Sequence, residues 1–298
     1  MNYKDSIVIE RLRKQHGEYF CYVVNPWHMN GWDENVATTE DPTLFIPNAS
    51  PTIQSWLSAS SSLNGPENLT VVSASSADTE MGTGAKKIRL VGINENLEHD
   101  FEDVKMDGTN AVTTTKKWAA INSARVIEGN NANSHITVKA IGGTVVVASI
   151  YSGMGTSASG TYTVPPGKTL YLTNFRVSIE SSAEVRGRWY LNSSKRIEDS
   201  SPTRFGITRV MSGMAVSTEV GENIFSQPLE FGPLSQVSFV AEVVSGTADI
   251  SVFAEGFEVI GDSKELQRIY KNKLSDYVYS PKRYEKKTHR RATVRKRK

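Results

Sequence analysis

The stretch from residue 160 to residue 191, GTYTVPPGKTLYLTNFRVSIESSAEVRGRWYL, decides the fold class of this chain. Pro165-Pro166-Gly167 turns the chain, because proline fixes φ and glycine accepts positive φ. A strand with apolar residues at mostly alternating positions follows, from Leu170 to Ile179, and Ser181-Ser182-Ala183 turns the chain again. Two turns between three alternating runs predict a meander with one buried and one exposed face, which we place at the centre of a β-sandwich.

Similar alternating runs recur about every ten residues between residues 69 and 260, without a long helical period. This spacing predicts an all-β protein with one or two β-sandwich or jelly-roll-like domains. Asp107-Gly108, Gly142-Gly143 and Gly246-Thr247 each separate two apolar runs, and we expect each to connect the strands of a hairpin.

The chain divides into four segments. Residues 1–66 are expected to hold N-terminal strands and an extended arm, residues 67–155 a first β-sandwich domain, and residues 156–261 a second. Residues 262–298 are expected to hold a short C-terminal helix and a basic tail. The helix is placed at residues 262–274, where Asp262 or Ser263 can cap an apolar stripe formed by Leu266, Ile269, Tyr270 and Leu274.

Charge is segregated along the sequence, although the net charge is only +2. Residues 281–298 carry ten basic residues and one Glu, which leaves 24 Lys and Arg against 31 Asp and Glu in the remainder, a net charge of −7. So dense a basic segment binds DNA phosphates or an acidic protein surface. The residues expected to bind such a polyanion or acidic partner are Lys282, Arg283, Lys286, Lys287, Arg290, Arg291, Arg295, Lys296, Arg297 and Lys298.

The expected arm covers residues 41–66, which contain four prolines and eight serines or threonines. Its apolar anchors are Leu44, Phe45, Ile46, Ile53, Trp56 and Leu57. An arm lying on a neighbouring subunit would use such anchors, and so would a strap across its own domain. The sequence leaves both open.

Trp27 and Trp32 lie in a turn-rich stretch, residues 25–32, which we expect to be a loop. Tryptophans in such a loop either cap the edge of a core or form an aromatic platform for a sugar or a partner. They are the candidate ligand platform of this chain.

Several kinds of chemistry are disfavoured by the residues themselves. A single cysteine, Cys21, excludes an intrachain disulfide framework and indicates a reducing compartment. The charged start of the sequence is not typical of a signal peptide, and no stretch is long and apolar enough for a membrane span. Gly167-Lys168-Thr169 is not a phosphate-binding loop, because position 162 lacks the required glycine and a strand follows.

A further candidate is an acidic cluster formed by His99, Asp100, Glu102 and Asp103. It is either a Ca²⁺ site or a solvated acidic strand face, and the latter is favoured because no ligand spacing accompanies it. We therefore expect no metal, no cofactor, no catalytic residue and no enzymatic activity.

Three motifs carry a resemblance to a known group of proteins: TVPPGKTLYL at residues 163–172, Gly82-x-Gly84-Ala85 with the strand after it, and Asp107-Gly108-Thr109. Together they resemble strand and turn patterns of virion structural proteins of tailed bacteriophages. The resemblance implies a non-enzymatic, β-rich component of the head, neck or tail, built into a symmetric oligomer.

We therefore expect a phage virion structural protein that is assembled in the host cytoplasm. Its expected partners are copies of itself, other virion proteins and, through the tail, DNA or an acidic surface; no membrane is involved. One alternative is a carbohydrate- or receptor-binding module of a spike or fibre, with Trp27 and Trp32 among its stacking residues. Another is a shell protein whose tail binds nucleic acid.

Overall fold

The structure, a computed structural model, describes residues 24–37, 43–44, 66–141, 146–158, 160–180, 186–196, 205–216, 220–243 and 247–260. These residues form fifteen strands, β1–β15, and no helix is found among them. The expected all-β class is confirmed for this part of the chain. The expected helix at 262–274, the basic tail, Cys21 and most of the arm lie outside the described residues.

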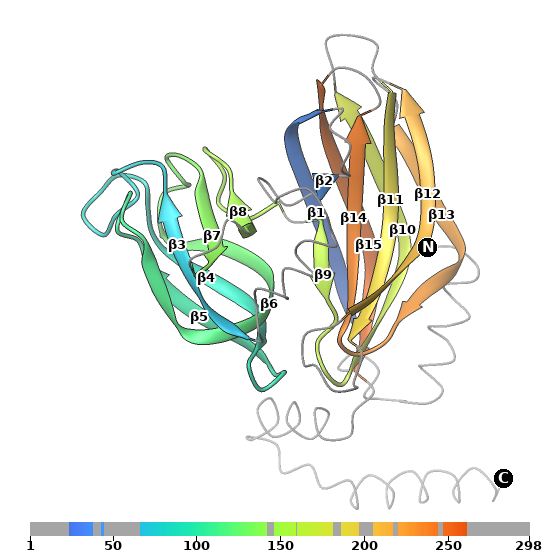
Figure 1. Cartoon of the computed structure of the whole chain (residues 1–298), viewed down its shortest axis with the longest axis horizontal. Coiled ribbons are helices and arrows are strands. Elements are labelled where there is room, and N and C mark those ends of the chain that lie inside the picture. Colours follow the sequence, from blue (N-terminus) through green and yellow to red (C-terminus); the bar gives the residue numbers. More distant parts are fainter. Residues whose placement is uncertain are drawn as a thin grey trace, which may run out of the picture.

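Two antiparallel sheets pack face to face in one unit of the molecule (Figure 1). The first sheet has the order β1 (Val24–Ala37), β15 (Thr247–Ile260), β10 (Lys168–Glu180) and β13 (Val220–Phe231). The second has the order β12 (Phe205–Val216), β11 (Arg186–Arg196), β14 (Ser235–Val243) and β2 (Thr43–Leu44), and β9 (Thr161–Thr163) also pairs with β14. Phe175 of the first sheet contacts Phe239 of the second, with ring centroids 5.0 Å apart, in the core between them.

Strands β2 and β9 are two pieces of one interrupted strand. Leu44 lies opposite Val240 of β14, and Thr161 lies opposite Ser238. At the position between them, the amide of Phe239 donates to the carbonyl of Gly160 at 2.8 Å. The chain therefore leaves this strand after Leu44 and re-enters it in register at Gly160.

Counting β2 and β9 as one strand gives eight strands in chain order. The first sheet then contains strands one, eight, three and six, and the second contains strands two, seven, four and five. This interleaving of two Greek keys is the topology of a jelly roll. Residues 24–44, assigned from sequence to an N-terminal segment, contribute β1 and part of the second strand to the same unit as residues 160–260.

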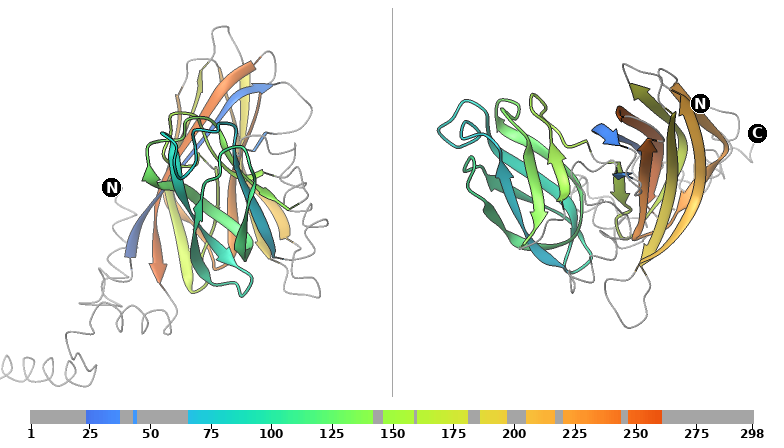
Figure 2. Two further views of the ribbon diagram at one scale, coloured as in Figure 1. Left: turned by 90° about the vertical axis from the view of Figure 1, so that its left-hand side faces the viewer. Right: turned by 45° about the horizontal axis from the view of Figure 1, so that its top comes forward.

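The second unit is inserted into the interrupted strand and is one curled antiparallel sheet (Figure 2). Its strand order is β5 (His99–Lys105), β4 (Ala85–Asn94), β6 (Val112–Gly129), β3 (Glu67–Ser73), β7 (Ile136–Ala140) and β8 (Val146–Ile150). It has its own core, in which Ile88, Leu90 and Ile136 are fully buried. The expectation of a β-sandwich here is wrong, because a single sheet curls around this core. We call this unit the inserted domain.

The expected meander at 160–191 is also wrong. Its first turn forms, with Gly167 at φ +74° and the Lys168 amide donating to the Pro165 carbonyl at 3.2 Å. However, β9 pairs with β14, β10 belongs to the first sheet and β11 to the second. In a jelly roll the chain crosses from one sheet to the other at such turns, so a reversal does not make neighbours of the strands it connects.

The three expected hairpins have different outcomes. Asp107-Gly108 does not join paired strands, because β4 lies between β5 and β6. Strands β14 and β15, on either side of residues 244–246, lie in different sheets. Strands β7 and β8 do pair, which confirms the hairpin expected around Gly142-Gly143, although these two glycines are outside the described residues.

Residues 25–32 are not a loop but part of β1, which pairs with β15 from Val24 onward. Met29 and Gly31 are buried, whereas His28 and Asn30 are exposed, so the stretch alternates as a strand should. Pro26 is compatible with this strand because β1 lies at the edge of its sheet, where a missing amide donor is tolerated.

Candidate functional site: a cleft beside the inserted domain

Strands β6 and β9 join the two units. The side chain of Asn122 donates through Nδ2 to the Thr163 carbonyl at 2.8 Å and accepts the Thr163 amide at Oδ1, also at 2.8 Å. Leu234, in the turn before β14, packs against the core of the inserted domain, and its amide donates to the Val164 carbonyl at 2.9 Å. These contacts fix the inserted domain beside the interrupted strand.

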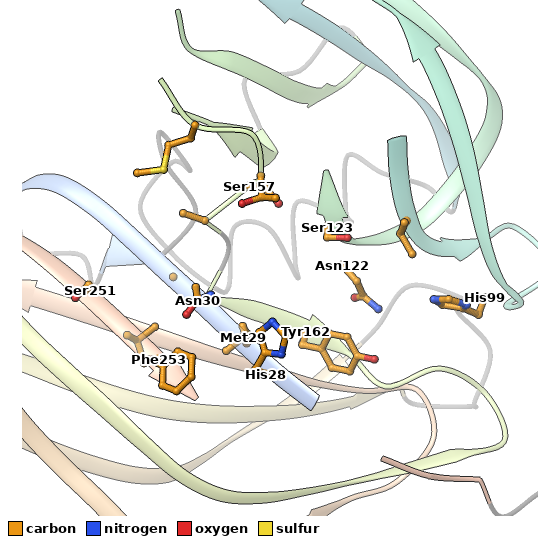
Figure 3. Close-up of a pocket in the computed structure, with 16 residues that line it drawn as sticks. His28, Met29, Asn30, His99, Asn122, Ser123, Ser157, Tyr162, Ser251 and Phe253 are labelled. Atoms are coloured by element: carbon orange, nitrogen blue, oxygen red, sulfur yellow. The ribbon is translucent and has the colours of Figure 1, made fainter. Parts of the chain in front are cut away.

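Next to this junction lies a cleft with a volume of about 620 Å³ (Figure 3). Strands β1 and β15 form its wall on the jelly roll, together with Tyr162 of β9. Strands β4, β5 and β6 and residues 154–158 form its wall on the inserted domain. The cleft therefore lies between the two units and takes one wall from each.

The jelly-roll wall places an amide opposite an aromatic ring. Asn30 and Phe253 are directly paired across β1 and β15. Their neighbours Met29 and Ala254 are also paired and are buried in the core, so Asn30 and Phe253 belong to the other face of the sheet. His28 is exposed on the same face as Asn30, as Figure 3 shows.

The opposite wall carries short polar side chains. Asn122 and Ser123 come from β6, and His99 comes from the start of β5. Ser157 is held against β6 because its amide donates to the Ala124 carbonyl at 2.7 Å and its Oγ accepts the Ala124 amide at 2.9 Å. Met154, which is 44% exposed, is the largest apolar side chain on this rim.

The described lining of the cleft consists of apolar side chains, amides, hydroxyls and imidazoles, without a carboxylate, ammonium or guanidinium group. Among the described residues that line it, none is Asp, Glu, Lys or Arg, in a chain of which 22% is charged. The nearby carboxylate of Glu258 is buried, and it accepts hydrogen bonds from Tyr162 Oη at 2.5 Å and Lys168 Nζ at 2.8 Å. Its charge is thus compensated within the jelly roll.

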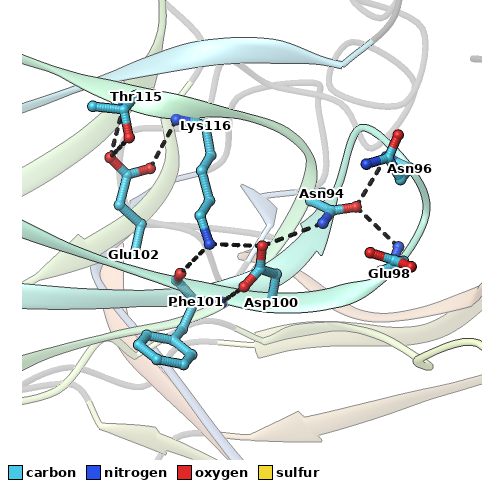
Figure 4. Close-up of polar contacts among 8 residues, drawn as sticks. All are labelled: Asn94, Asn96, Glu98, Asp100, Phe101, Glu102, Thr115 and Lys116. Carbon is cyan, nitrogen blue, oxygen red and sulfur yellow. Dashed lines mark hydrogen bonds and ion pairs between the residues drawn. The ribbon is translucent and has the colours of Figure 1, made fainter.

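The acidic cluster on β5 is a set of separate paired carboxylates (Figure 4). Asp100 accepts from Lys116 Nζ at 2.7 Å, and Glu102 accepts from the amide and hydroxyl of Thr115 at 2.7 and 2.9 Å. Partial burial raises the pKa of Asp100, but hydrogen bonds from Lys116, the Phe101 amide and Asn94 outweigh it, so that this pKa lies below its usual value.

Asp103 points to a different partner. The guanidinium of Arg89 donates to both of its oxygens, at 2.6 and 2.7 Å, and this bidentate pairing lowers the pKa of Asp103. Within the part of the chain that the structure describes, no group of three His, Cys, Asp or Glu side chains is arranged to hold a metal ion.

Most residues singled out from the sequence lie elsewhere or outside the described part. Trp27 lies opposite Gly256 and Trp32 opposite Ser251 within β1, so both belong to a strand and not to the expected loop. Of the arm anchors, Leu44 is in β2 and pairs with this chain's own β14; Phe45, Ile46, Ile53, Trp56, Leu57 and the ten basic residues of the tail fall outside.

Except for His99, which the sequence offers only as part of the acidic cluster, the residues that line the cleft are not predicted from the sequence, because they come from seven separate places in the chain. The only local signal was the alternation of polar and apolar residues around Met29, which marks His28 and Asn30 as an exposed face. No pattern along the chain indicates that β6 of the inserted domain lies across from it.

The comparisons with known proteins add little to this picture. No model of a protein family and no curated protein matches the sequence. Among solved structures, T=1 particles derived from infectious bursal virus match at 9% identity over 89% of this chain and 84% of that chain, with a TM-score of 0.13. The VP2 subviral particle of infectious bursal disease virus matches at 10% identity over 81% and 82%, also at 0.13.

TM-scores this low do not define a shared fold, and the jelly-roll assignment rests on strand order alone. No helix long and apolar enough to cross a membrane occurs among the described residues.

Proposed function

We propose that this protein is a non-enzymatic structural component of a virion, and specifically of a tailed phage, that assembles as a symmetric oligomer. The observation that carries the proposal is the interleaved strand order of the eight-stranded jelly roll. Double-sheet jelly rolls are a recurrent architecture of viral capsid domains. The phage assignment is supported by the sequence motifs that resemble phage virion proteins.

Two features of the sequence fit such a role. The arm at residues 41–66 supplies apolar anchors that add buried area between subunits without enlarging the domain. The tail supplies ten basic residues for DNA or for an acidic surface of another virion protein. Closed symmetric assemblies repeat each such contact once per subunit.

The test of assembly is the oligomeric mass of the purified full chain, measured by native mass spectrometry and checked by electron microscopy. We expect one defined symmetric species or a closed particle. A chain that stays monomeric at concentrations up to about 100 μM would remove the proposal, since obligate contacts in shells form well below that.

The tail is tested separately by deleting residues 281–298. The oligomer is expected to persist, whereas binding to duplex DNA is lost. With the tail present, the logarithm of the DNA association constant should fall with the logarithm of salt concentration with a slope of up to about nine, because ten basic groups displace counterions. A full chain without affinity for DNA at low salt would assign the tail to an acidic protein surface.

A further inference from the structure

The cleft between the units is not explained by an assembly role. It is a concave site shared by two folded units, and its walls combine the aromatic rings of Phe253 and Tyr162 with carboxamides, hydroxyls and imidazoles. A charged ligand would need opposite charges, because a buried unpaired charge is strongly disfavoured. A lining without carboxylate, ammonium or guanidinium groups therefore favours an uncharged ligand.

The arrangement of the jelly-roll wall narrows the ligand class further. The ring of Phe253 offers a flat apolar surface, and the Asn30 side chain beside it offers both hydrogen-bond donors and an acceptor. Ser123 offers a hydroxyl that donates and accepts from the other side. A pyranose ring matches this combination, because it has an apolar face of C–H groups and a rim of hydroxyls that each donate and accept.

We propose that this cleft binds a neutral oligosaccharide, with one sugar ring stacked on Phe253 and its hydroxyls bonded to Asn30 and to Ser123 on the facing wall. Jelly-roll domains serve as lectins as well as capsid proteins, so the scaffold is compatible with both roles. The inference does not depend on the proposed assembly: a monomer that binds the sugar refutes only assembly, and an oligomer that does not bind it refutes only the cleft.

The principal rival occupant is an extended uncharged peptide added to the outer edge of β1. Two features of that edge disfavour it. Pro26 removes one amide donor, and a register shift between Asp33 and Val36 interrupts the ladder. Prolines and bulges are the devices by which edge strands resist further pairing.

In the experiment the full chain is titrated with maltoheptaose, with N-acetylglucosamine tetramer and with a neutral galacto-tetrasaccharide. Binding of each sugar is measured by calorimetry and by saturation-transfer NMR. At least one of these neutral probes is expected to bind with millimolar to micromolar affinity. Tetragalacturonate, an anionic sugar of similar size, should not displace the bound neutral sugar. Tetragalacturonate can also bind to the basic tail, and that binding is recognised because substitutions in the cleft leave its affinity unchanged.

Three variants locate the site. Phe253→Ala is expected to weaken binding by about tenfold or more, and Asn30→Ala by about three- to tenfold, because stacking and hydrogen bonding are lost separately. Phe101→Ala is the matched control, since Phe101 is also a partly exposed aromatic residue on a strand but lies outside the cleft; it should bind as the unaltered protein does. Circular dichroism confirms that each variant is folded.

Three results would overturn the proposal. One is the absence of binding by every neutral probe up to about 10 mM. Another is unchanged affinity in both Phe253→Ala and Asn30→Ala. The third is binding of a synthetic peptide with the sequence of residues 58–64 that is weakened by Phe253→Ala while no sugar binds, which would assign the cleft to a peptide.

Discussion

At the scale of single residues, Asp78 organises one end of the inserted domain. Its side chain is fully buried and accepts hydrogen bonds from Ser73 Oγ at 2.6 Å and from the amides of Ala85 and Asn133 at 2.8 Å each. Gly84 is required beside it, because a Cβ there would lie 2.1 Å from Asp78 Oδ1. The Gly82-x-Gly84 motif, noted first as a likeness to phage proteins, thus has a packing reason in this chain.

Replacing Asp78 with alanine should lower the free energy of unfolding by about 2–4 kcal/mol, because several buried donors lose their acceptor at once. Urea denaturation monitored by fluorescence measures this loss. Asp107→Ala, which removes an exposed carboxylate, is the control and should change stability by no more than about 0.5 kcal/mol. Equal effects of the two variants would contradict the role assigned to Asp78.

Glu67 differs from Asp78 in that one of its carboxylate oxygens is buried without a hydrogen-bond donor. Its Oε1 is buried without a hydrogen bond, and so is Nε1 of Trp118, the residue opposite it on β6. Burial raises the pKa of Glu67 above its usual value of 4.5.

An acid whose pKa is raised by folding destabilises the fold once the pH exceeds its unfolded value, because the unfolded chain releases the proton more readily. Glu67→Gln should therefore raise the melting temperature at pH 7, and this advantage should shrink as the pH falls below 4.5. Thermal unfolding at pH 7 and pH 4 checks it. A lower melting temperature for the variant at pH 7 would show that the ionised carboxylate has a favourable partner.

At the scale of strands, the alternation of apolar residues predicts which positions are buried, whereas the turn residues predict only where the chain reverses. Leu170, Leu172, Phe175 and Val177 are all fully buried, and the irregular step between Leu172 and Phe175 coincides with a bulge in the pairing of β10 with both neighbours. The turn predicted at Pro165-Pro166-Gly167 is confirmed. A turn fixes only the reversal of the chain, so the sheet that each strand joins depends on packing between residues far apart.

Cross-strand ion pairs on β4 and β5 give a test at this scale. Arg89 and Asp103 lie directly opposite one another, and the guanidinium carbon of Arg89 is also 4.4 Å from the centre of the Phe101 ring. The side chains of the pair are 29% and 34% exposed, so solvent screens much of the attraction.

Asp103→Asn should reduce stability at pH 7 by no more than about 1 kcal/mol. A carboxyl whose pKa is lowered by folding stabilises the fold above its ordinary value, here 3.8, and loses this contribution as the pH falls through the folded value. The gap between variant and unaltered protein should therefore close as the pH falls below 3.8. Glu95→Gln, which removes a looser contact of 3.9 Å to Lys117, is the control and should have a smaller effect. A gap for Asp103→Asn that stays constant down to pH 2 would contradict the pairing.

At the scale of the whole molecule, the interrupted strand was beyond the reach of the sequence. Nothing local to Leu44 or Gly160 indicates that these residues continue one strand, because their relation is visible only in the register against β14. The cleft shares this dependence, since its two walls belong to units separated by the same insertion. The sequence could therefore predict the strands of each unit but not where the units meet.

Deleting residues 45–159 should leave a folded jelly roll, because Leu44 would then precede Gly160 in a strand that keeps its pairing with Val240, Phe239 and Ser238. A cooperative thermal transition with a β-type circular dichroism spectrum is the expected result. Deleting residues 45–160 instead is the control. It shifts Thr161 by one position and turns every later residue of the strand to the other face, so this variant should be clearly less stable. Two equally stable deletions would contradict the register.

The interrupted strand makes the jelly roll a suitable host for other inserted domains. The inserted domain enters and leaves the jelly roll at adjacent positions, so any foreign module whose own termini lie close together can replace it without stretching the host. In a closed particle each copy of the chain would then present the foreign module once, at a spacing set by the symmetry of the shell and not by the module itself.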